Sequence, residues 1–250
     1  MLITWSYTLL SVVLVSLISV VGVLFVSLKD GLFRKMTLYL VSFSCGALFG
    51  DTFIHILPEI AEKGGLTIQA SLLILSGIIM FFVMEKFINW RHCHIETSEG
   101  HPHPFAYTNL VGDGLHNFID GMMIAGSFMA SVPVGIATTV AVILHEIPAE
   151  IGEFSILVHA VFSKRKALLC NFLSATTAII GAIITLIAAA HIEQLPTILL
   201  PLTAGGFIYI AGSDLIPELH KDCEKAGRSF FQLVAILAGI ATMMLLLMVE

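Results

Sequence analysis

The sequence predicts an all-α integral membrane protein with eight transmembrane helices, and three observations lead to this prediction. Only 12 % of the 250 residues are charged, about half the share of a soluble globular chain, whereas 57 % are hydrophobic. The hydrophobic residues gather in stretches of about 20 or more, long enough to cross the hydrocarbon core of a bilayer. The basic residues gather at alternate ends of these stretches. Together with a net charge of −6, these features exclude a secreted domain, a nucleic-acid-binding protein and a disordered chain.

The eight predicted spans follow one another in a single transmembrane domain that covers residues 1–250. They lie at about 5–28, 37–60, 66–88, 105–129, 133–161, 167–190, 196–218 and 230–249. The first has no basic N-terminal region and no small-residue cleavage site close behind it, so we interpret it as a retained helix. The fourth, fifth and seventh contain acidic residues that a simple hydropathy window would penalise. We keep them as spans because their polar residues are clustered rather than scattered.

The distribution of lysine and arginine predicts the orientation of the spans, since short cytoplasmic loops are enriched in both residues. If both termini lie outside, 11 of the 12 basic residues fall at cytoplasmic ends and only Lys63 remains outside. The 11 are Lys29, Arg34, Lys35, Lys86, Arg91, Lys164, Arg165, Lys166, Lys221, Lys225 and Arg228.

No cysteine falls in an outer loop, so we expect no disulfide framework. Small residues such as Gly22 and Gly77 are suited to contacts between helices of one chain or of a homodimer.

One predicted cytoplasmic loop, at 89–104, is longer than the others and rich in histidine. Its sequence NWRHCHIETSEGHPHP contains His92, His94, His101 and His103. A tract of this kind binds soft or borderline metals, or it is a solvated linker whose histidines have no function. Its place beside the polar spans favours an auxiliary metal site.

Two segments of the chain resemble each other. Residues 46–60 (GALFGDTFIHILPEI) and 205–219 (GGFIYIAGSDLIPEL) share a glycine, a phenylalanine, an acid and an aliphatic-Pro-Glu ending. The first closes the second span on the outside, and the second closes the seventh span on the inside. Inverted-topology repeats place equivalent elements on opposite faces in this way.

The fourth and fifth spans contain polar residues that are costly in a membrane, about 2.5–3.5 kcal/mol for a charge at the bilayer centre. They are Asp113, His116, Asn117, Asp120, His145, Glu146, Glu150, Glu153 and His159. Neither span contains lysine or arginine, so the acids require shared protons or a bound cation. The alternative is a network of hydrogen bonds that only joins the helices. His159 lies near the cytoplasmic end and is better explained as an interfacial residue.

The spacing of these residues brings them onto common helical faces. His116 and Asp120 stack at i and i+4, as do Asp113 and Asn117. Glu146 stacks with Glu150 in the same way. Because a tight turn joins the two spans, they are antiparallel neighbours whose polar faces meet near mid-membrane. Imidazole, carboxylate and amide ligands suit Zn²⁺ and, less selectively, Fe²⁺, Mn²⁺, Cd²⁺ or Co²⁺.

These residues carry a resemblance to a known family. LHNFIDG at 115–121 and HEIPAEIGEF at 145–154 resemble the signature helices of the ZIP family of divalent-metal transporters, whose patterns are HNFxDG and HExPHExGDF. The resemblance extends to NFLSA at 171–175, to His55 and to the stretch from Asp214 to Glu218. It implies a ZIP-like bundle in which helices 1–3 and 6–8 form an inverted repeat around helices 4 and 5.

The resemblance also implies metal transport toward the cytosol through a two-metal centre between the fourth and fifth spans. The positions that match the family's metal ligands are His116, Asn117, Asp120, His145, Glu146 and Glu150. Auxiliary or pathway roles fall to His55, Asp113, Glu153, Asp214 and Glu218. Glu153 replaces an aspartate conservatively. Ala149 stands where the pattern has a metal-binding histidine, and because a methyl group cannot coordinate, one metal position is expected to be weakened or lost.

Two other functions compete with zinc transport. One is a membrane-embedded zinc metallohydrolase, since His145-Glu146 begins an HExxH-like pattern. The second histidine of that motif is Ala149 here, so the zinc site would lack a ligand. The other is a proton-coupled transporter of another solute, which explains the acids but gives the histidines no role. We therefore predict a non-enzymatic metal transporter, placed in the bacterial inner membrane.

Overall fold

The computed structural model describes residues 2–21, 30–90, 104–159, 164–192, 194–220 and 226–248. Within these ranges only the backbone is described at 30–35, 87–90, 104–109, 152, 155–156, 158–159, 164, 218 and 226–227. The predicted histidine tract, with His92, His94, His101 and His103, lies outside the described residues. The Glu218 and His159 side chains also lie outside them.

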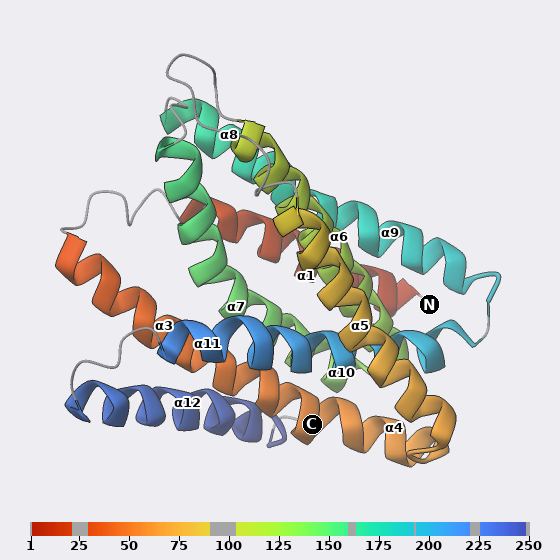
Figure 1. Ribbon diagram of the computed structural model, residues 1–250. Helices are drawn as coiled ribbons and strands as arrows, with labels where there is room; N and C mark the ends of the chain where they lie inside the picture. The colour runs from red at the N-terminus through yellow and green to blue at the C-terminus, as the bar shows by residue number, and fades with distance from the viewer. Residues whose placement is uncertain are drawn as a thin grey trace.

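The described part of the chain is helical and contains no strand. The helices are α1 (Leu2–Ile18), η1 (Ser19–Val21), α3 (Asp30–Gly50), η2 (Asp51–Ile56), α4 (Leu57–Gly64), α5 (Ile68–Trp90), α6 (Pro104–Ala130), α7 (Val132–His159), α8 (Lys164–Ala175), α9 (Thr177–Ala189), α10 (Leu195–Tyr209), η4 (Ile210–Leu215), α11 (Ile216–His220) and α12 (Ala226–Leu246). Figure 1 shows them packed together as one bundle.

Seven helical stretches of the described residues are long and apolar enough to cross a membrane. They are Leu2–Val21, Met36–Gly64, Ile68–Lys86, Val132–Ile151, Arg165–Ala189, Leu195–Leu215 and Arg228–Leu246. The predicted fourth span corresponds to α6, which has 27 residues but is not among the seven. Four polar residues, from Asp113 to Asp120, interrupt the apolar sequence of α6. The all-helical membrane fold is thus confirmed, while the count of eight spans stays a prediction.

Two of the long helices are interrupted by a π-helix, and in both cases a proline follows. The N–H group of Leu57 donates to the Thr52 carbonyl group, five residues back, at the end of η2. The N–H group of Ile216 donates to the Ala211 carbonyl group in the same way at the end of η4. Pro58 and Pro217 come next in the chain. Because proline has no N–H group and its ring collides with the preceding turn, a wider turn lets the helix continue.

The two π-helices occupy equal positions in the two similar segments. η2 begins at Asp51, five residues after Gly46, and η4 begins at Ile210, five residues after Gly205. Each π-helix therefore occupies the same place in its segment. This match supports the predicted inverted repeat, which itself stays a prediction.

Glycines bring α3 into backbone contact with α12, and α10 into backbone contact with α5. A Cβ atom at Gly46 of α3 would lie 2.0 Å from the carbonyl oxygen of Ile236 in α12. One at Gly205 of α10 would lie 2.0 Å from the carbonyl oxygen of Ile74 in α5. The partner helices contribute reciprocal glycine contacts from Gly239 and Gly77. Gly77 therefore serves a contact within the chain. Any residue larger than glycine would force these helices apart.

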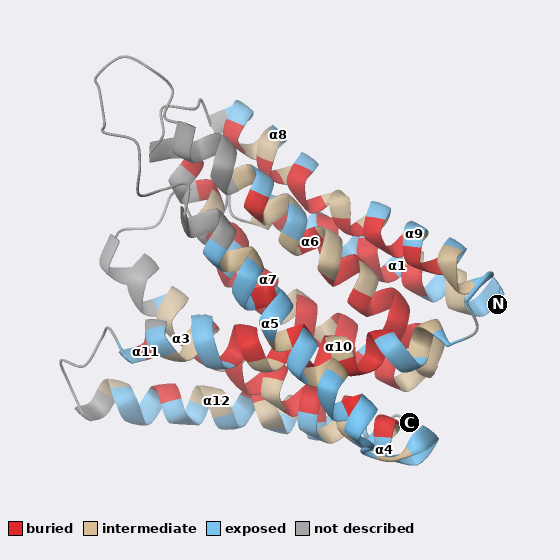
Figure 2. Cartoon of the chain, turned by 45° about the vertical axis from the view of Figure 1, so that its right-hand side comes forward, coloured by how far each residue is buried: buried red, intermediate tan, exposed pale blue. Residues whose placement is uncertain are grey.

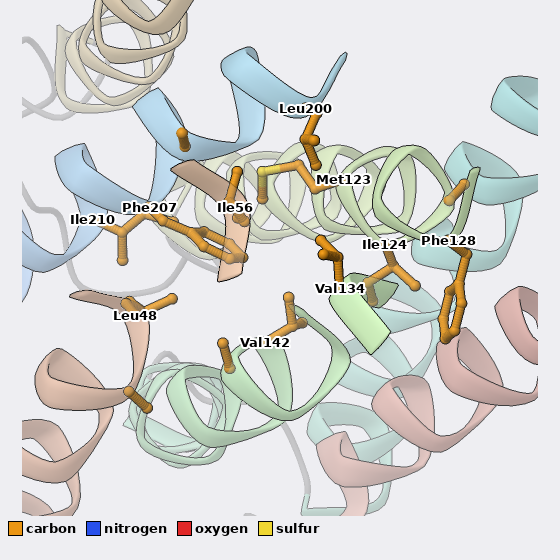
Figure 3. Packing of buried hydrophobic residues seen from close by; sticks show 14 of the residues in the cluster. Leu48, Ile56, Met123, Ile124, Phe128, Val134, Val142, Leu200, Phe207 and Ile210 are labelled. Atoms are coloured by element: carbon orange, nitrogen blue, oxygen red, sulfur yellow. The ribbon is translucent and has the colours of Figure 1, made fainter. Parts of the chain in front are cut away.

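The core lies between α3, α6, α7 and α10. Figure 2 shows buried residues on the facing sides of these helices, whereas α5 and α12 expose much of their surface. Figure 3 shows the packing of ten labelled side chains from these four helices and the adjoining π-helices. They are Leu48, Ile56, Met123, Ile124, Phe128, Val134, Val142, Leu200, Phe207 and Ile210. This core occupies the half of the bundle that contains the end of α6 and the start of α7.

Candidate metal centre

The turn between α6 and α7 fixes the two helices that carry the predicted ligands. Ser131 is its only non-helical residue, and its N–H group donates to the Ser127 carbonyl oxygen at 3.0 Å. The Ser131 Oγ atom accepts from the Val134 N–H group at 3.3 Å, which satisfies one of the free donors at the start of α7. The helices are therefore antiparallel neighbours, as the sequence predicts.

Four side chains of α6 and α7 converge near the middle of the bundle. One ligand atom from each of His116, Asp120, His145 and Glu146 lies within 4.8 Å of the others. The His145 Nε2 atom lies 3.2 Å from Asp120 Oδ2 and 3.3 Å from Glu146 Oε1. The His116 Nε2 atom lies 3.3 Å from Glu146 Oε1 and 3.8 Å from Asp120 Oδ2. We call these four residues the metal centre.

The two imidazole rings are held by contacts outside the metal centre. His145 Nδ1 lies 3.2 Å from the Ala141 carbonyl oxygen, which fits the tautomer that carries its proton on Nδ1 and turns the Nε2 lone pair to the centre. The Phe207 ring meets the His145 ring edge-on at 6.3 Å. The Phe81 ring meets the His116 ring edge-on at 6.0 Å. These contacts hold both rings with an Nε2 atom toward the metal centre.

Two further predicted ligands, Asn117 and Glu150, hydrogen-bond to other residues. Asn117 Nδ2 donates to Asp113 Oδ1 at 3.1 Å, which confirms the predicted i, i+4 pair. Asn171 Nδ2 in α8 donates to Glu150 Oε2. The second oxygen of Glu150 and the amide oxygen of Asn117 are buried and have no hydrogen-bond partner among the described residues. Their role as ligands stays a prediction.

The auxiliary residues lie at different places around the centre. His55 is buried in η2, and its Nε2 atom lies 2.9 Å from the Met243 carbonyl oxygen in α12. Glu153 is partly buried in α7, and Asp214 is exposed in η4. Glu218 lies in α11, where only the backbone is described. None of the three described side chains belongs to the metal centre.

The structure adds polar residues near the centre that the sequence analysis did not select as site residues. Tyr209 Oη in α10 donates to Glu85 Oε2 in α5, and the Tyr209 ring packs against Phe81, which contacts His116. Glu85 could have been selected from the sequence because it is an acid inside the third predicted span. Asn171 was matched only through its family motif, and nothing in the sequence marks it as the partner of Glu150.

Comparison with known proteins gives a consistent result over most of the chain. The family model described as ZIP zinc transporter matches residues 2–105 and 91–247. The zinc transporter ZIP13 of Pongo abelii is 33 % identical over 263 residues, covering 97 % of this chain and 78 % of the relative. The ZIP13 homolog of Drosophila melanogaster is 30 % identical, covering 88 % and 80 %. The zinc transporter SLC39A7 of Mus musculus is 26 % identical, covering 98 % and 70 %. These matches, together with the helical fold and the metal centre, show that the chain belongs to the ZIP zinc transporter family.

Proposed function

We propose that this chain transports zinc across the membrane toward the cytosol, through the metal centre between α6 and α7. The observation that carries the proposal is the convergence of two imidazole and two carboxylate ligands within 4.8 Å. Two carboxylates and two neutral imidazoles neutralise a divalent cation, so the loaded centre carries no net charge in a medium where a charge is costly. Cd²⁺, Fe²⁺, Mn²⁺ and Co²⁺ share this ligand chemistry and are further candidate substrates.

Alternating access is the mechanism that we propose, and the burial around the centre supports it. Toward the predicted outer end, the space between the helices is filled by side chains such as Met123, Ile124 and Val142, at most 4 % exposed. On the other side, the His116 side chain is 21 % exposed and Asp214 is exposed. We infer that the structure is closed to the outside and that zinc leaves past His116.

Zinc uptake into proteoliposomes tests the proposal. The purified chain is reconstituted with a zinc-sensitive dye inside the vesicles, and external Zn²⁺ is added with the other divalent ions as competitors. We expect saturable uptake that protein-free vesicles lack. Uptake no faster than in protein-free vesicles would overturn the proposal. Transport in the opposite direction alone would overturn the cytosolic direction.

Membership of a transporter family is evidence against the metallohydrolase alternative. In addition, residue 149 is alanine, so the second histidine that such a zinc site needs is missing. We also propose, from the sequence, that both termini lie on the non-cytoplasmic side of a bacterial inner membrane. The relatives named above come from animals, so this location rests on the sequence alone. A homodimer is the assembly that we propose, and light scattering in detergent tests it.

Replacing Ala149 by histidine is expected to raise the zinc bound per chain from one ion toward two. Ala149 is exposed on α7, so a larger side chain can be accommodated, and its neighbours Glu146 and Glu150 supply carboxylates. Equilibrium dialysis measures the stoichiometry, with Ala149→Leu as a control of similar bulk that has no ligand atom. An equal stoichiometry in both variants would show that residue 149 does not limit a second site.

Zinc affinity is expected to fall as the pH is lowered from 7.5 to 5.5. The imidazoles of His116 and His145 bind metal only when their Nε2 atoms are unprotonated, so protons and zinc compete for the same lone pairs. Titration calorimetry at several pH values measures the affinity and the protons released. A pH-independent affinity would contradict a centre that contains two histidines.

A further inference from the structure

The helix that carries half of the metal centre contains a proline. Pro148 lies inside α7, two residues after Glu146. In a regular α-helix the N–H group of residue 148 would donate to the carbonyl oxygen of Leu144, four residues earlier. Proline has no such group, so that carbonyl needs another donor within the protein. Leu144 directly precedes His145, so its carbonyl group belongs to the peptide bond that joins the two residues.

A side chain from another helix supplies the missing donor. Ser44 of α3 is 1 % exposed, and its Oγ atom donates to the Leu144 carbonyl oxygen. The same Oγ atom lies 2.8 Å from the Leu40 carbonyl oxygen in its own helix. A hydroxyl group has one proton, so Ser44 satisfies one of these two acceptors at a time. Its own helix thus offers the hydroxyl a second partner when α7 is not in place.

Other buried hydroxyl groups show what is particular to Ser44. Ser42 in the same helix donates to the Leu38 carbonyl oxygen at 2.8 Å. Thr203, two residues before Gly205 as Ser44 is two before Gly46, donates to the Leu199 carbonyl oxygen at 3.0 Å. These bonds within a helix are common for serine and threonine. Ser44 differs from these two residues because its hydroxyl group also contacts a carbonyl group of another helix, and Pro148 cannot supply the usual i+4 donor to that carbonyl.

We propose that Ser44 is a positioning residue for the metal centre, acting through the Leu144 carbonyl group, whose usual i+4 helical donor is absent at Pro148. The bond fixes α7 against α3 at the residue before His145 and so sets where the ligand atoms of His145 and Glu146 lie. Residues that hydrogen-bond directly to metal ligands change affinity about 10- to 100-fold when they are removed, and we expect Ser44 to act at the lower end of that range. The proposal rests on metal binding at the centre but not on transport or its direction.

The test is cobalt binding by the full-length protein in detergent, since the visible absorption of Co²⁺ reports both its affinity and the geometry of its ligands. We expect Ser44→Ala to weaken Co²⁺ binding about 10-fold and to change the absorption spectrum. Ser42→Ala removes a neighbouring buried hydroxyl and is expected to match the wild-type chain. Ser44→Thr keeps a hydroxyl group and is expected to bind Co²⁺ as the wild-type chain does. Ser44→Val has the size of the threonine variant but no hydroxyl group, so it is expected to bind Co²⁺ as weakly as Ser44→Ala.

A double substitution separates this mechanism from a general packing effect. Pro148→Ala restores the N–H donor for the Leu144 carbonyl, so adding Ser44→Ala to that variant is expected to change affinity less than 2-fold. The proposal is overturned if Ser44→Ala binds as Ser42→Ala does, or if it costs about 10-fold in the Pro148→Ala background as well. If either alanine variant fails to fold, equal binding by Ser44→Thr and Ser44→Val overturns it. A wild-type chain that binds no cobalt would overturn the metal centre itself, whereas normal binding without zinc uptake would overturn only the transport function.

Discussion

Zinc uptake is expected to disappear when His116 or Asp120 is replaced by alanine, while the protein still folds. Each residue supplies one of four ligand atoms that lie within 4.8 Å of one another. Loss of a direct ligand is expected to exceed the 10- to 100-fold effect of supporting residues, so we expect zinc affinity to fall more than about 100-fold. Neither substitution adds a polar group to the membrane interior, and Asp120→Ala removes a buried acid.

His191→Ala is the matched control for this experiment. His191 is exposed in the turn after α9, where its Nδ1 atom lies 3.1 Å from the Ile187 carbonyl oxygen. We expect this variant to transport zinc at the wild-type rate. Elution as a single species in gel filtration checks folding, and dye-reported uptake in proteoliposomes measures transport. Full uptake by both centre variants would show that the metal passes elsewhere.

Replacing Gly121 by alanine is expected to destabilise the protein by at least about 3 kcal/mol, the upper end of the usual cost of overpacking. Gly121 follows Asp120 directly, and a Cβ atom there would lie 1.9 Å from the Ala178 carbonyl oxygen of α9. A Cβ atom at Gly181 would likewise lie 2.0 Å from the Phe118 carbonyl oxygen. Because the opposing atoms belong to the backbone, the helices must separate, and Asp120 moves with α6.

Gly64→Ala is the control for this second prediction. A Cβ atom at Gly64 would have no neighbour within 4 Å. Since alanine favours a helix over glycine by about 1 kcal/mol, this variant is expected to be as stable as the wild type or slightly more stable. Thermal unfolding in detergent measures both. Equal midpoints for the two variants would contradict the close contact of α6 with α9.

The helical fold was predictable because a long apolar stretch is a strong sequence signal for a membrane-spanning helix. The predicted ligands His116 and Asp120 also stack as expected, since an i, i+4 spacing fixes one face of a helix. Two features were not predictable. The π-helices depend on local adjustments around Pro58 and Pro217, which a count of apolar residues does not detect.

The second feature that the sequence could not predict is the different role of Glu146 and Glu150. Both occupy one predicted stripe of the fifth span, yet Glu146 belongs to the metal centre while Glu150 accepts from Asn171. Spacing decides which face a side chain occupies but not which distant residue meets it there. The pairing of Leu144 with Ser44 is unpredictable for the same reason, because 100 residues separate them.

The glycine contacts of α3 with α12 and of α5 with α10 have a thermodynamic consequence. In lipid the hydrophobic effect does not drive helices together, because the surrounding hydrocarbon chains are as apolar as leucine. The close backbone contacts that Gly46 and Gly205 permit are instead held by dispersion forces. Separating such helices exposes their surfaces to lipid rather than to water, so we expect a much smaller heat-capacity change than the unfolding of a water-soluble core of equal area produces. The association of these pairs is therefore expected to weaken steadily with temperature, without the loss of stability on cooling that apolar hydration causes in soluble proteins.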